Sequence, residues 1–434
     1  MSAKVLPKSS SNWKIPFFTI WTGQAISLLG SQLVGFALVW WMTVTTGSAK
    51  VLALAAMMEW LPRVFIGPLA GALADRWNRR GIMLAADSLT AVATAALIYL
   101  GWAGQMELWH VYLLMLLRST GGAFHWPAMQ ASTSLMVPKE QLSRVQGLNQ
   151  LLTGLMNIAA PPLGGLLVGL MPLHAVLAID IGTAVLAILP LCFLRIPQPR
   201  SSEEETPMAD EKLSVWQEMR EGMRYVWNWP GLRAILVVAV LLNLVTMPAF
   251  SLLPLLVMDH FGGSAMEIAS MQSSWAIGML VGGVLLSVWG GFRRKIVTST
   301  VGMFGSAIGM FLVGFAPGTA LGLAVAGNLV AGLMNVLING PAFALLQTVV
   351  DPKMQGRVLS LVVSLANAMT PLGLAIAGPL AEITGVRVWF ILTGVAFLLA
   401  GVFVLVNQDV QNIEADRPAV NLGEEKASPI VGNA

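Results

Sequence analysis

Residues 71–80 read GALADRWNRR, a short turn with four charged side chains between two long apolar stretches. The flanking stretches run over about 51–73 and 81–103. Each is long enough to supply the roughly 20 apolar residues that a helix needs to cross the hydrocarbon core of a bilayer. Charged turns of this kind recur along the chain. This alternation predicts a polytopic membrane protein.

The composition indicates the same class. Only 11% of the 434 residues are charged, 56% are hydrophobic, and the mean hydropathy is +0.74, whereas soluble domains carry about 25% charged residues. The single cysteine, Cys192, excludes an internal disulfide and a cysteine-based zinc site. These features argue against a soluble enzyme, a secreted disulfide scaffold and a nucleic-acid-binding protein.

Apolar stretches separated by turns predict twelve transmembrane helices. Only helices and closed barrels satisfy backbone groups in lipid, and no alternating strands of the barrel type appear. The predicted fold class is all-α, with spans near 17–43, 51–73, 81–103, 108–129, 148–171, 174–196, 232–258, 266–290, 296–316, 319–349, 358–382 and 388–407.

The lysines and arginines predict the orientation. Of 25 such residues, only Lys50 and Arg387 fall on connections opposite the N-terminus, while Arg63 and Arg118 lie inside spans. Because positively charged loops stay in the cytoplasm, both termini are predicted to be cytoplasmic and the protein to lie in the cell membrane. The basic pI of about 9.1 reflects this asymmetry and requires no nucleic acid partner.

The two halves of the chain resemble each other. Pro127-Ala128 and Pro138-Lys139 at the exit from the fourth span recur as Pro341-Ala342 and Pro352-Lys353 at the exit from the tenth. Parallel repeats of six helices are a transporter architecture in which the substrate path lies between the halves. We therefore predict two pseudo-symmetric six-helix bundles.

The predicted divisions follow from these patterns. From Ser214, apolar residues recur at spacings of three and four, which predicts an amphipathic helix on the membrane surface. The divisions are a cytoplasmic N-terminal segment over 1–16, a first bundle over 17–196, a cytoplasmic linker over 197–231, a second bundle over 232–407 and a disordered cytoplasmic tail over 408–434.

The charged turn resembles the cytoplasmic loop motif of the major facilitator superfamily, G-x-L-x-D-R-x-G-R-R. Asn78 stands where glycine is usual, and asparagine tolerates a positive φ better than most residues. Arg118 corresponds to the arginine of a second superfamily motif. Ala160–Gly165 resembles the antiporter element G-P-x-x-G-G through Pro161, Gly164 and Gly165, with Ala160 in place of its first glycine.

Within the superfamily, the chain resembles the macrolide-efflux branch from Trp13 to about Val406. The resemblance rests on strings that include residues 118–128, 178–180, 278–283 and 356–361. Siderophore-exporting relatives share several of these strings. The resemblance implies the major facilitator fold and a transporter without enzymatic activity, cofactor or metal.

The resemblance also implies a gate that holds the halves together on the cytoplasmic side. Its residues are Gly71, Asp75, Arg76, Arg79 and Arg80. The alternative is that Asp75 only caps a helix, where a carboxylate meets the positive end of the helix dipole, and that the arginines only set the topology.

Four charged residues inside spans are candidates for proton coupling: Arg118, Glu59, Asp180 and Asp87. A central arginine costs about 2.5–3.5 kcal/mol on insertion scales and should face a cavity or a partner. Glu59 and Arg63 stand four apart and are expected to pair. Asp180 has no basic residue near it in the sequence, so desolvation would favour its neutral form. The alternatives are an Arg118 bonded to carbonyl groups and a Glu59–Arg63 pair that only satisfies itself. His125 is predicted to be structural.

Aromatic and polar residues well inside spans are candidates for lining a substrate cavity, although helix packing would explain any one of them. They are Gln24, Trp60, Asn157, Asn243, Met247, Phe250, Gln272, Trp275 and Asn335. Glycine pairs such as Gly278-x-x-x-Gly282 predict close helix packing.

The predicted function is proton-coupled efflux of amphipathic compounds such as macrolides by alternating access, carried out by a monomer. The absence of a G-x-x-x-x-G-K-[ST] string argues against ATP-driven export. The alternatives are an exporter or importer of a specific metabolite such as a siderophore, and a membrane sensor that transports nothing.

Overall fold

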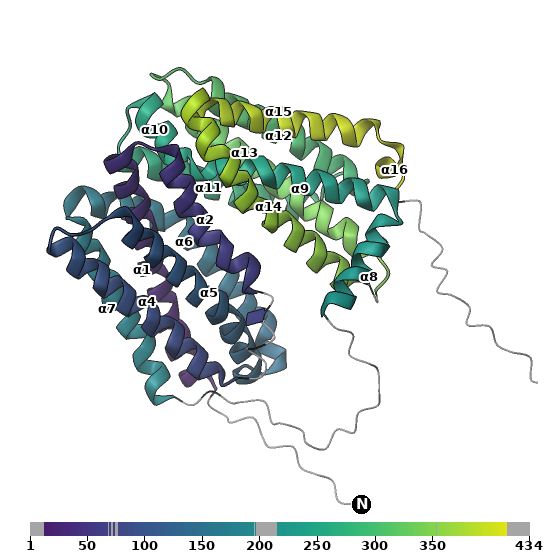
Figure 1. Ribbon diagram of the computed structural model, residues 1–434. Coiled ribbons are helices and arrows are strands. Elements are labelled where there is room, and N and C mark those ends of the chain that lie inside the picture. Colours follow the sequence, from purple (N-terminus) through teal and green to yellow (C-terminus); the bar gives the residue numbers. More distant parts are fainter. Residues whose placement is uncertain are drawn as a thin grey trace, which may run out of the picture.

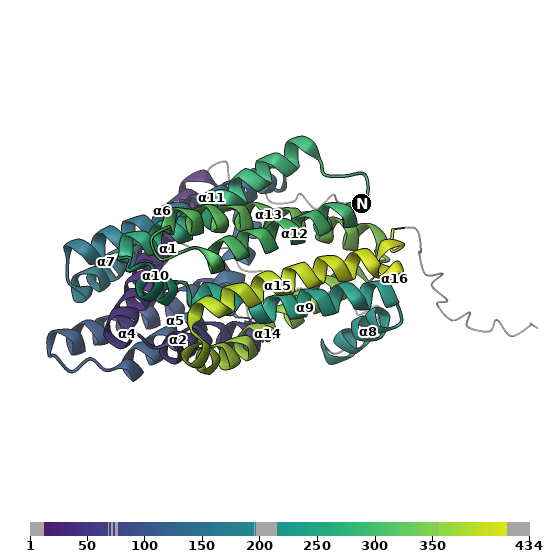
Figure 2. The same ribbon diagram turned by 90° about the horizontal axis from the view of Figure 1, so that it is seen from above.

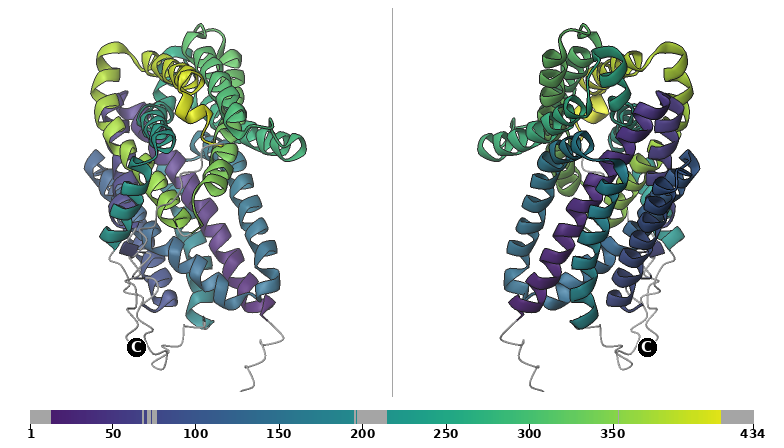
Figure 3. Two further views of the ribbon diagram at one scale, coloured as in Figure 1. Left: turned by 90° about the vertical axis from the view of Figure 1, so that its right-hand side faces the viewer. Right: turned by 90° about the vertical axis from the view of Figure 1, so that its left-hand side faces the viewer.

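The computed structural model describes residues 13–67, 69–70, 73, 77–194, 196, 215–352 and 354–414. Regular structure in these residues is entirely helical, and Figure 1 shows the helices gathered into two bundles that lie side by side. The view from above in Figure 2 and the side views in Figure 3 show the same two bundles.

The first bundle contains six long helices, which cover the first six predicted spans. They are α1 (Lys14–Thr46), α2 (Ala49–Phe65), α4 (Arg79–Trp102), α5 (Leu108–Met136), α6 (Leu142–Leu170) and α7 (Leu173–Phe193). A short 3-10 helix, η1 (Lys139–Gln141), joins α5 to α6.

The second bundle begins with a span made of two helices, α9 (Pro230–Ser251) and α10 (Leu253–Phe261), which meet at Leu252. The other helices of this bundle are α11 (Ala265–Trp289), α12 (Lys295–Phe315), α13 (Leu321–Val349), α14 (Gln355–Thr384) and α15 (Val386–Val406). The linker contributes α8 (Val215–Trp227), and the short α16 (Gln408–Gln411) follows α15.

Ten of the described helices are long and apolar enough to cross a membrane, namely α1, α4, α6, α7, α9 and α11 to α15. The other two predicted spans are covered by α2 and α5. Helix α2 packs between α5 and α14, and α5 also packs against α4. The prediction of an all-helical membrane fold in two bundles is confirmed.

Each bundle has two ends, which are named here by their connections. The linker end holds residues 137–141, 290–294 and 350–354, together with the helix ends that flank the linker. The far end holds the connections at 47–48, 103–107, 171–172, 262–264, 316–320 and 385. By the lysine and arginine pattern, the linker end is the predicted cytoplasmic end.

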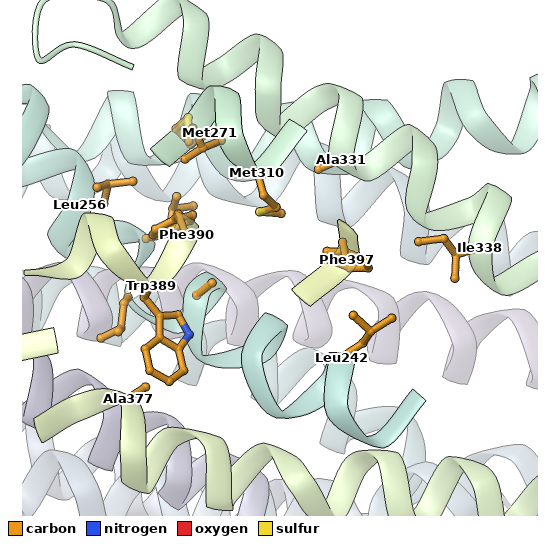
Figure 4. Close-up of a cluster of buried hydrophobic side chains, with 14 of the residues drawn as sticks. Leu242, Leu256, Met271, Met310, Ala331, Ile338, Ala377, Trp389, Phe390 and Phe397 are labelled. Atoms are coloured by element: carbon orange, nitrogen blue, oxygen red, sulfur yellow. The ribbon is translucent and has the colours of Figure 1, made fainter. Parts of the chain in front are cut away.

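The second bundle is held together by large buried side chains and by close approach of helix backbones. Figure 4 shows Phe390 and Phe397 of α15 among buried side chains of neighbouring helices. The indole Nε1 of Trp389 donates a hydrogen bond to the Val245 carbonyl at 2.8 Å. A Cβ atom added at Gly278 would lie 2.1 Å from the Leu329 carbonyl oxygen. Helices α11 and α13 therefore meet at their backbones, as the glycine spacing predicts.

Helix α8 has a contact that the sequence pattern does not predict, because it docks on the linker end of the second bundle. Glu221 lies 2.5 Å from the Arg357 guanidinium of α14, and Val226 is fully buried. Gly222 lies directly against the Arg357 backbone. The linker helix thus packs on the second bundle through its buried face.

The chain remains ordered beyond the predicted start of the disordered tail at residue 408. The side chain of Asn407 caps α16, and Val410 and Ile413 are fully buried. Burial of these two apolar side chains against the bundle accounts for the order of residues 408–413. The tail from residue 415 onward lies outside the described residues.

The contact between α11 and α13 gives a matched pair of stability predictions. Gly278→Ala places a methyl group against the backbone of α13, and overpacking of this kind costs about 1–3 kcal/mol. Gly283→Ala on the same helix meets no atom within 4 Å, and alanine gains up to about 1 kcal/mol of helix propensity. Thermal unfolding in detergent should show a lower midpoint for Gly278→Ala than for Gly283→Ala. Equal midpoints would contradict the backbone contact.

Candidate functional site

The two bundles are joined at the far end by a charged contact between α2 and α14. Lys50 Nζ lies 2.5 Å from Glu382 Oε2, and Ser48 Oγ donates to Glu382 Oε1 at 2.6 Å. Beside it, a Cβ atom at Gly378 would lie 2.9 Å from the Ala53 Cβ. Small residues thus allow the two helices to touch where the ion pair forms.

A second contact joins α6 to α11. A Cβ atom at Gly165 would lie 3.0 Å from the Ala265 carbonyl oxygen, and Ser273 Oγ donates to the Ile158 carbonyl at 2.9 Å. Gly164 packs instead on the Phe36 ring of α1. Two glycines of the antiporter-like motif therefore serve helix contacts, one of them between the bundles.

A cavity of about 870 Å³ lies between the bundles. Helices α1, α2, α4, α5, α6 and α7 line it from one side, and α9, α10, α11 and α13 line it from the other. Its walls include the predicted cavity residues Gln24, Asn157, Phe250, Gln272 and Trp275, and also Pro161 of the antiporter-like motif. The Phe250 and Trp275 rings meet edge to face, with centroids 4.3 Å apart.

Four other cavity candidates do not line it, namely Trp60, Asn243, Met247 and Asn335. The Asn243 amide donates to the Ala239 carbonyl of its own helix, and the Asn335 side chain accepts from Asn339 one turn away. The Trp60 ring lies 5.8 Å from the Arg63 guanidinium carbon. Depth along a span places a residue near the middle of the membrane, but it does not say which face of the helix the residue occupies.

The deepest charged group in the cavity wall is Asp180 of α7, whose side chain is 2% exposed. Arg118 Nη1 of α5 lies 2.5 Å from Asp180 Oδ2. Ser31 Oγ of α1 and Thr94 Oγ1 of α4 donate to the same carboxylate, at 3.2 and 3.3 Å. No basic residue lies near Asp180 in the sequence, but the fold brings it a basic partner, Arg118, from 62 residues away.

Arg118 is tied to the same four helices. Its Nη2 donates to the Ser31 carbonyl at 3.2 Å, and its side chain is 14% exposed. A guanidinium with a carboxylate partner and a carbonyl acceptor keeps its charge without facing lipid. The pair therefore joins α1, α4, α5 and α7 into one polar network.

A second pair, an aspartate beside a histidine, lies in the wall closer to the linker end. His125 Nε2 of α5 is 3.4 Å from Asp87 Oδ1 of α4, and Gln24 Nε2 of α1 donates to Asp87 Oδ2 at 3.0 Å. The contact between His125 Nε2 and Asp87 Oδ1 does not have the geometry of a hydrogen bond. The Nε2 atom is buried, and it has no hydrogen-bond partner among the described residues.

Glu59 and Arg63 form the third pair in the wall, at 3.0 Å along α2, as their spacing predicts. Both side chains are about half exposed, at 45% and 50%. Ion pairs this open contribute little to stability. All four coupling candidates, Glu59, Asp87, Arg118 and Asp180, thus line one cavity.

The gating motif is described only in part, since Gly71, Asp75 and Arg76 lie outside the described residues. Arg79 donates to the Ala131 carbonyl of α5 at 3.0 Å. Arg80 donates to the Leu191 and Cys192 carbonyls near the end of α7. Cations near helix C-termini are stabilised by the helix dipole, so these two arginines bind the linker ends of α5 and α7.

Three residues of the site were not predicted to function, namely Ser31, Thr94 and His125. The sequence does contain a pattern that points to them. A spacing of seven residues separates Gln24 from Ser31, Asp87 from Thr94, and Arg118 from His125. Two helical turns separate the members of each pair, so they can share a face of their helices. No group of three histidine, cysteine, aspartate or glutamate side chains suited to a metal occurs in the described part of the chain.

Comparisons with known proteins agree with this architecture. The family model of the Major Facilitator Superfamily matches residues 20–362 and 246–431. Macrolide efflux protein A of Streptococcus pyogenes is 34% identical over 408 residues, covering 93% of this chain and 98% of that protein. Multidrug efflux pump Tap of Mycobacterium tuberculosis is 25% identical over 403 residues, covering 89% and 92%.

Solved structures share the fold at low sequence identity. A bacterial homologue of the human lysosomal transporter Spinster, in an inward-facing and unoccupied conformation, has a TM-score of 0.71 at 15% identity and covers 94% of this chain and 99% of its own. A bacterial homologue of the iron transporter ferroportin, in an inward-facing state, has a TM-score of 0.70 at 16% identity and covers 92% and 99%. The chain belongs to the major facilitator superfamily, in its macrolide-efflux branch, and is a multi-pass membrane transporter rather than an enzyme.

Proposed function

We propose that this protein exports amphipathic drug-like compounds, macrolides among them, from the cytoplasm in exchange for protons. The observation that carries the proposal is the cavity between the bundles, which combines aromatic surface with two arginine–carboxylate pairs and an aspartate–histidine pair. An amphipathic compound needs both kinds of surface. The names of the relatives, a macrolide efflux protein and a multidrug efflux pump, support the same substrate class.

Alternating access is the proposed mechanism. Within the described part of the chain, hydrogen bonds and an ion pair join the bundles at the far end and beside the cavity. With both termini in the cytoplasm, as the basic residues favour, these contacts close the outer side. Export then requires them to open while the bundles close at the linker end, where Gly71, Asp75, Arg76, Arg79 and Arg80 form the proposed gate.

The Arg118–Asp180 pair supports rigid movement of the first bundle. Four of its six helices share this network, so they are expected to move together as the cavity changes sides. A buried ion pair is costly to break by removing one partner, because the other charge is left alone in an apolar environment. Rigidity of one bundle is what a rocking mechanism needs.

The pair gives a stability prediction. Asp180→Asn leaves Arg118 without a counter-charge and should lower the free energy of unfolding by about 3–5 kcal/mol. The double variant Arg118→Met with Asp180→Leu should recover much of that loss, since neither charge then remains alone. Denaturation of the purified variants in detergent measures both. A double variant less stable than Asp180→Asn would refute the account.

The far-end contact gives a prediction about alternating access. Ser48→Cys with Glu382→Cys, made after Cys192→Ser, places two thiols on facing helices. Cross-linking them with a short thiol reagent should abolish macrolide export, because the outer side cannot open. A reducible reagent should allow recovery on reduction. Export that continues after complete cross-linking would rule out opening at this contact.

Drug accumulation in cells tests the function as a whole. Cells that express the protein should accumulate less macrolide than cells without it, and a proton uncoupler should remove the difference. Accumulation that is equal in both cells at verified expression would exclude macrolide export. A difference that persists with the uncoupler would exclude proton coupling while leaving export in place.

A further inference from the structure

Two layers of polar side chains, similar in composition, lie in the first bundle. Gln24, Asp87 and His125 make the layer closer to the linker end. Seven residues along the same helices, Ser31, Thr94 and Arg118 make the inner layer around Asp180. Seven residues of helix rise by about 10.5 Å. Each layer therefore contains one carboxylate and one basic side chain, and all four of these groups line the cavity.

The layers differ in whether the basic group can lose its charge. Arginine stays protonated under all physiological conditions, so Arg118 remains positive beside Asp180. Histidine is the side chain that ordinarily changes charge between about pH 5 and 8. The inner layer is therefore a fixed ion pair, whereas the layer of Asp87 and His125 can gain or lose a proton.

Each of the other two acids in the described cavity wall is paired with an arginine. Six described residues of the wall can carry charge, and they come from α2, α4, α5 and α7. Glu59 on α2 has Arg63, and Asp180 on α7 has Arg118. The described wall residues on α1, α6, α9, α10, α11 and α13 are uncharged. Among the three acids of the described wall, Asp87 alone lies beside a histidine rather than an arginine.

From this arrangement we propose that Asp87 and His125 together carry the coupled proton, a role that rests on the proposed proton-driven export. A proton from water on the outer side binds His125 Nε2, which then donates a charge-assisted hydrogen bond to Asp87. When the cavity faces the linker end, the proton leaves to water there. The pair changes its net charge from −1 to zero on protonation and back again on release.

Three observations favour this site over the inner pair. His125 Nε2 is buried, faces Asp87 Oδ1 at 3.4 Å and has no hydrogen-bond partner among the described residues. Protonation would turn this approach into a strong hydrogen bond. Asp180 is already bound by Arg118, Ser31 and Thr94. The side chains of Asp87 and His125 are 13% and 20% exposed, against 2% for Asp180, so this layer is more open to the cavity than the Asp180 carboxylate is.

The test uses the full chain in proteoliposomes with a labelled macrolide as the probe. Two activities are measured between pH 5 and 8: uphill accumulation driven by an imposed pH gradient, and exchange with equal pH on both sides. His125→Gln should reduce uphill accumulation by about tenfold or more, as loss of a proton-transferring group does. Exchange should persist and lose its pH dependence. The control is His174→Gln, the same change at an exposed residue near the far end, which should behave as the unchanged protein.

Asp87→Asn supplies an independent readout. Without the carboxylate, protonated His125 loses its counter-charge, so the pH dependence of exchange should move to lower pH. A purely structural role for the pair would lower activity without moving the pH profile. If the His125→Gln protein shows no macrolide exchange at all, the pH profile of exchange by Asp87→Asn decides whether the pair carries the proton.

Uphill accumulation by His125→Gln with an unchanged pH profile would overturn the assignment while leaving proton-coupled export intact. A pH profile of exchange that does not move in Asp87→Asn would also overturn the assignment. If the unchanged protein shows no gradient-driven accumulation, the proposed function fails, and this assignment fails with it.

Discussion

An arginine in the middle of an apolar helix must have a counter-charge and acceptors, because lipid supplies neither. Arg118 meets this requirement with Asp180 and the Ser31 carbonyl. To do so it brings four helices of the first bundle to one point, which fixes their rotation and faces their polar side chains toward the cavity. The layer of Asp87 and His125 follows from the same rotation, since both layers use the same faces of α1, α4 and α5.

The second bundle is built on a different principle. Its contribution to the described cavity wall is uncharged and includes the apolar side chains of Phe250, Trp275, Met279 and Leu280. Close backbone packing at Gly278 and Gly332, rather than a charged network, holds α11 against α13. The two halves share a helix pattern but differ in the side chains that they present to the cavity. The charged residues of the described wall lie in the first half, whereas both halves supply apolar surface.

The sequence predicted the features that depend only on residues close to one another along the chain. The apolar stretches indicate the helices because each span must satisfy its own backbone groups, and the Glu59–Arg63 pair is one turn of a single helix. Arg118 and Asp180 come from different helices, and no local pattern joins them. Asn243 and Asn335 lie inside predicted spans but not in the cavity wall, and their amides bond within their own helices. The order of residues 408–413 depends on burial of Val410 and Ile413, which a polar surrounding sequence conceals.

The contact between the bundles is built so that it can open. Lys50 and Glu382 are 59% and 31% exposed, and exposed ion pairs contribute little to stability. The other contacts include the hydrogen bonds of Ser48 and Ser273 and van der Waals packing at Gly165 and Gly378, with no hydrophobic driving force between helices in lipid. A ligand moves such an equilibrium only by its difference in affinity for the two states. Under the proposed alternating access, weak closure at the far end would let a modest difference in affinity change the side to which the cavity opens.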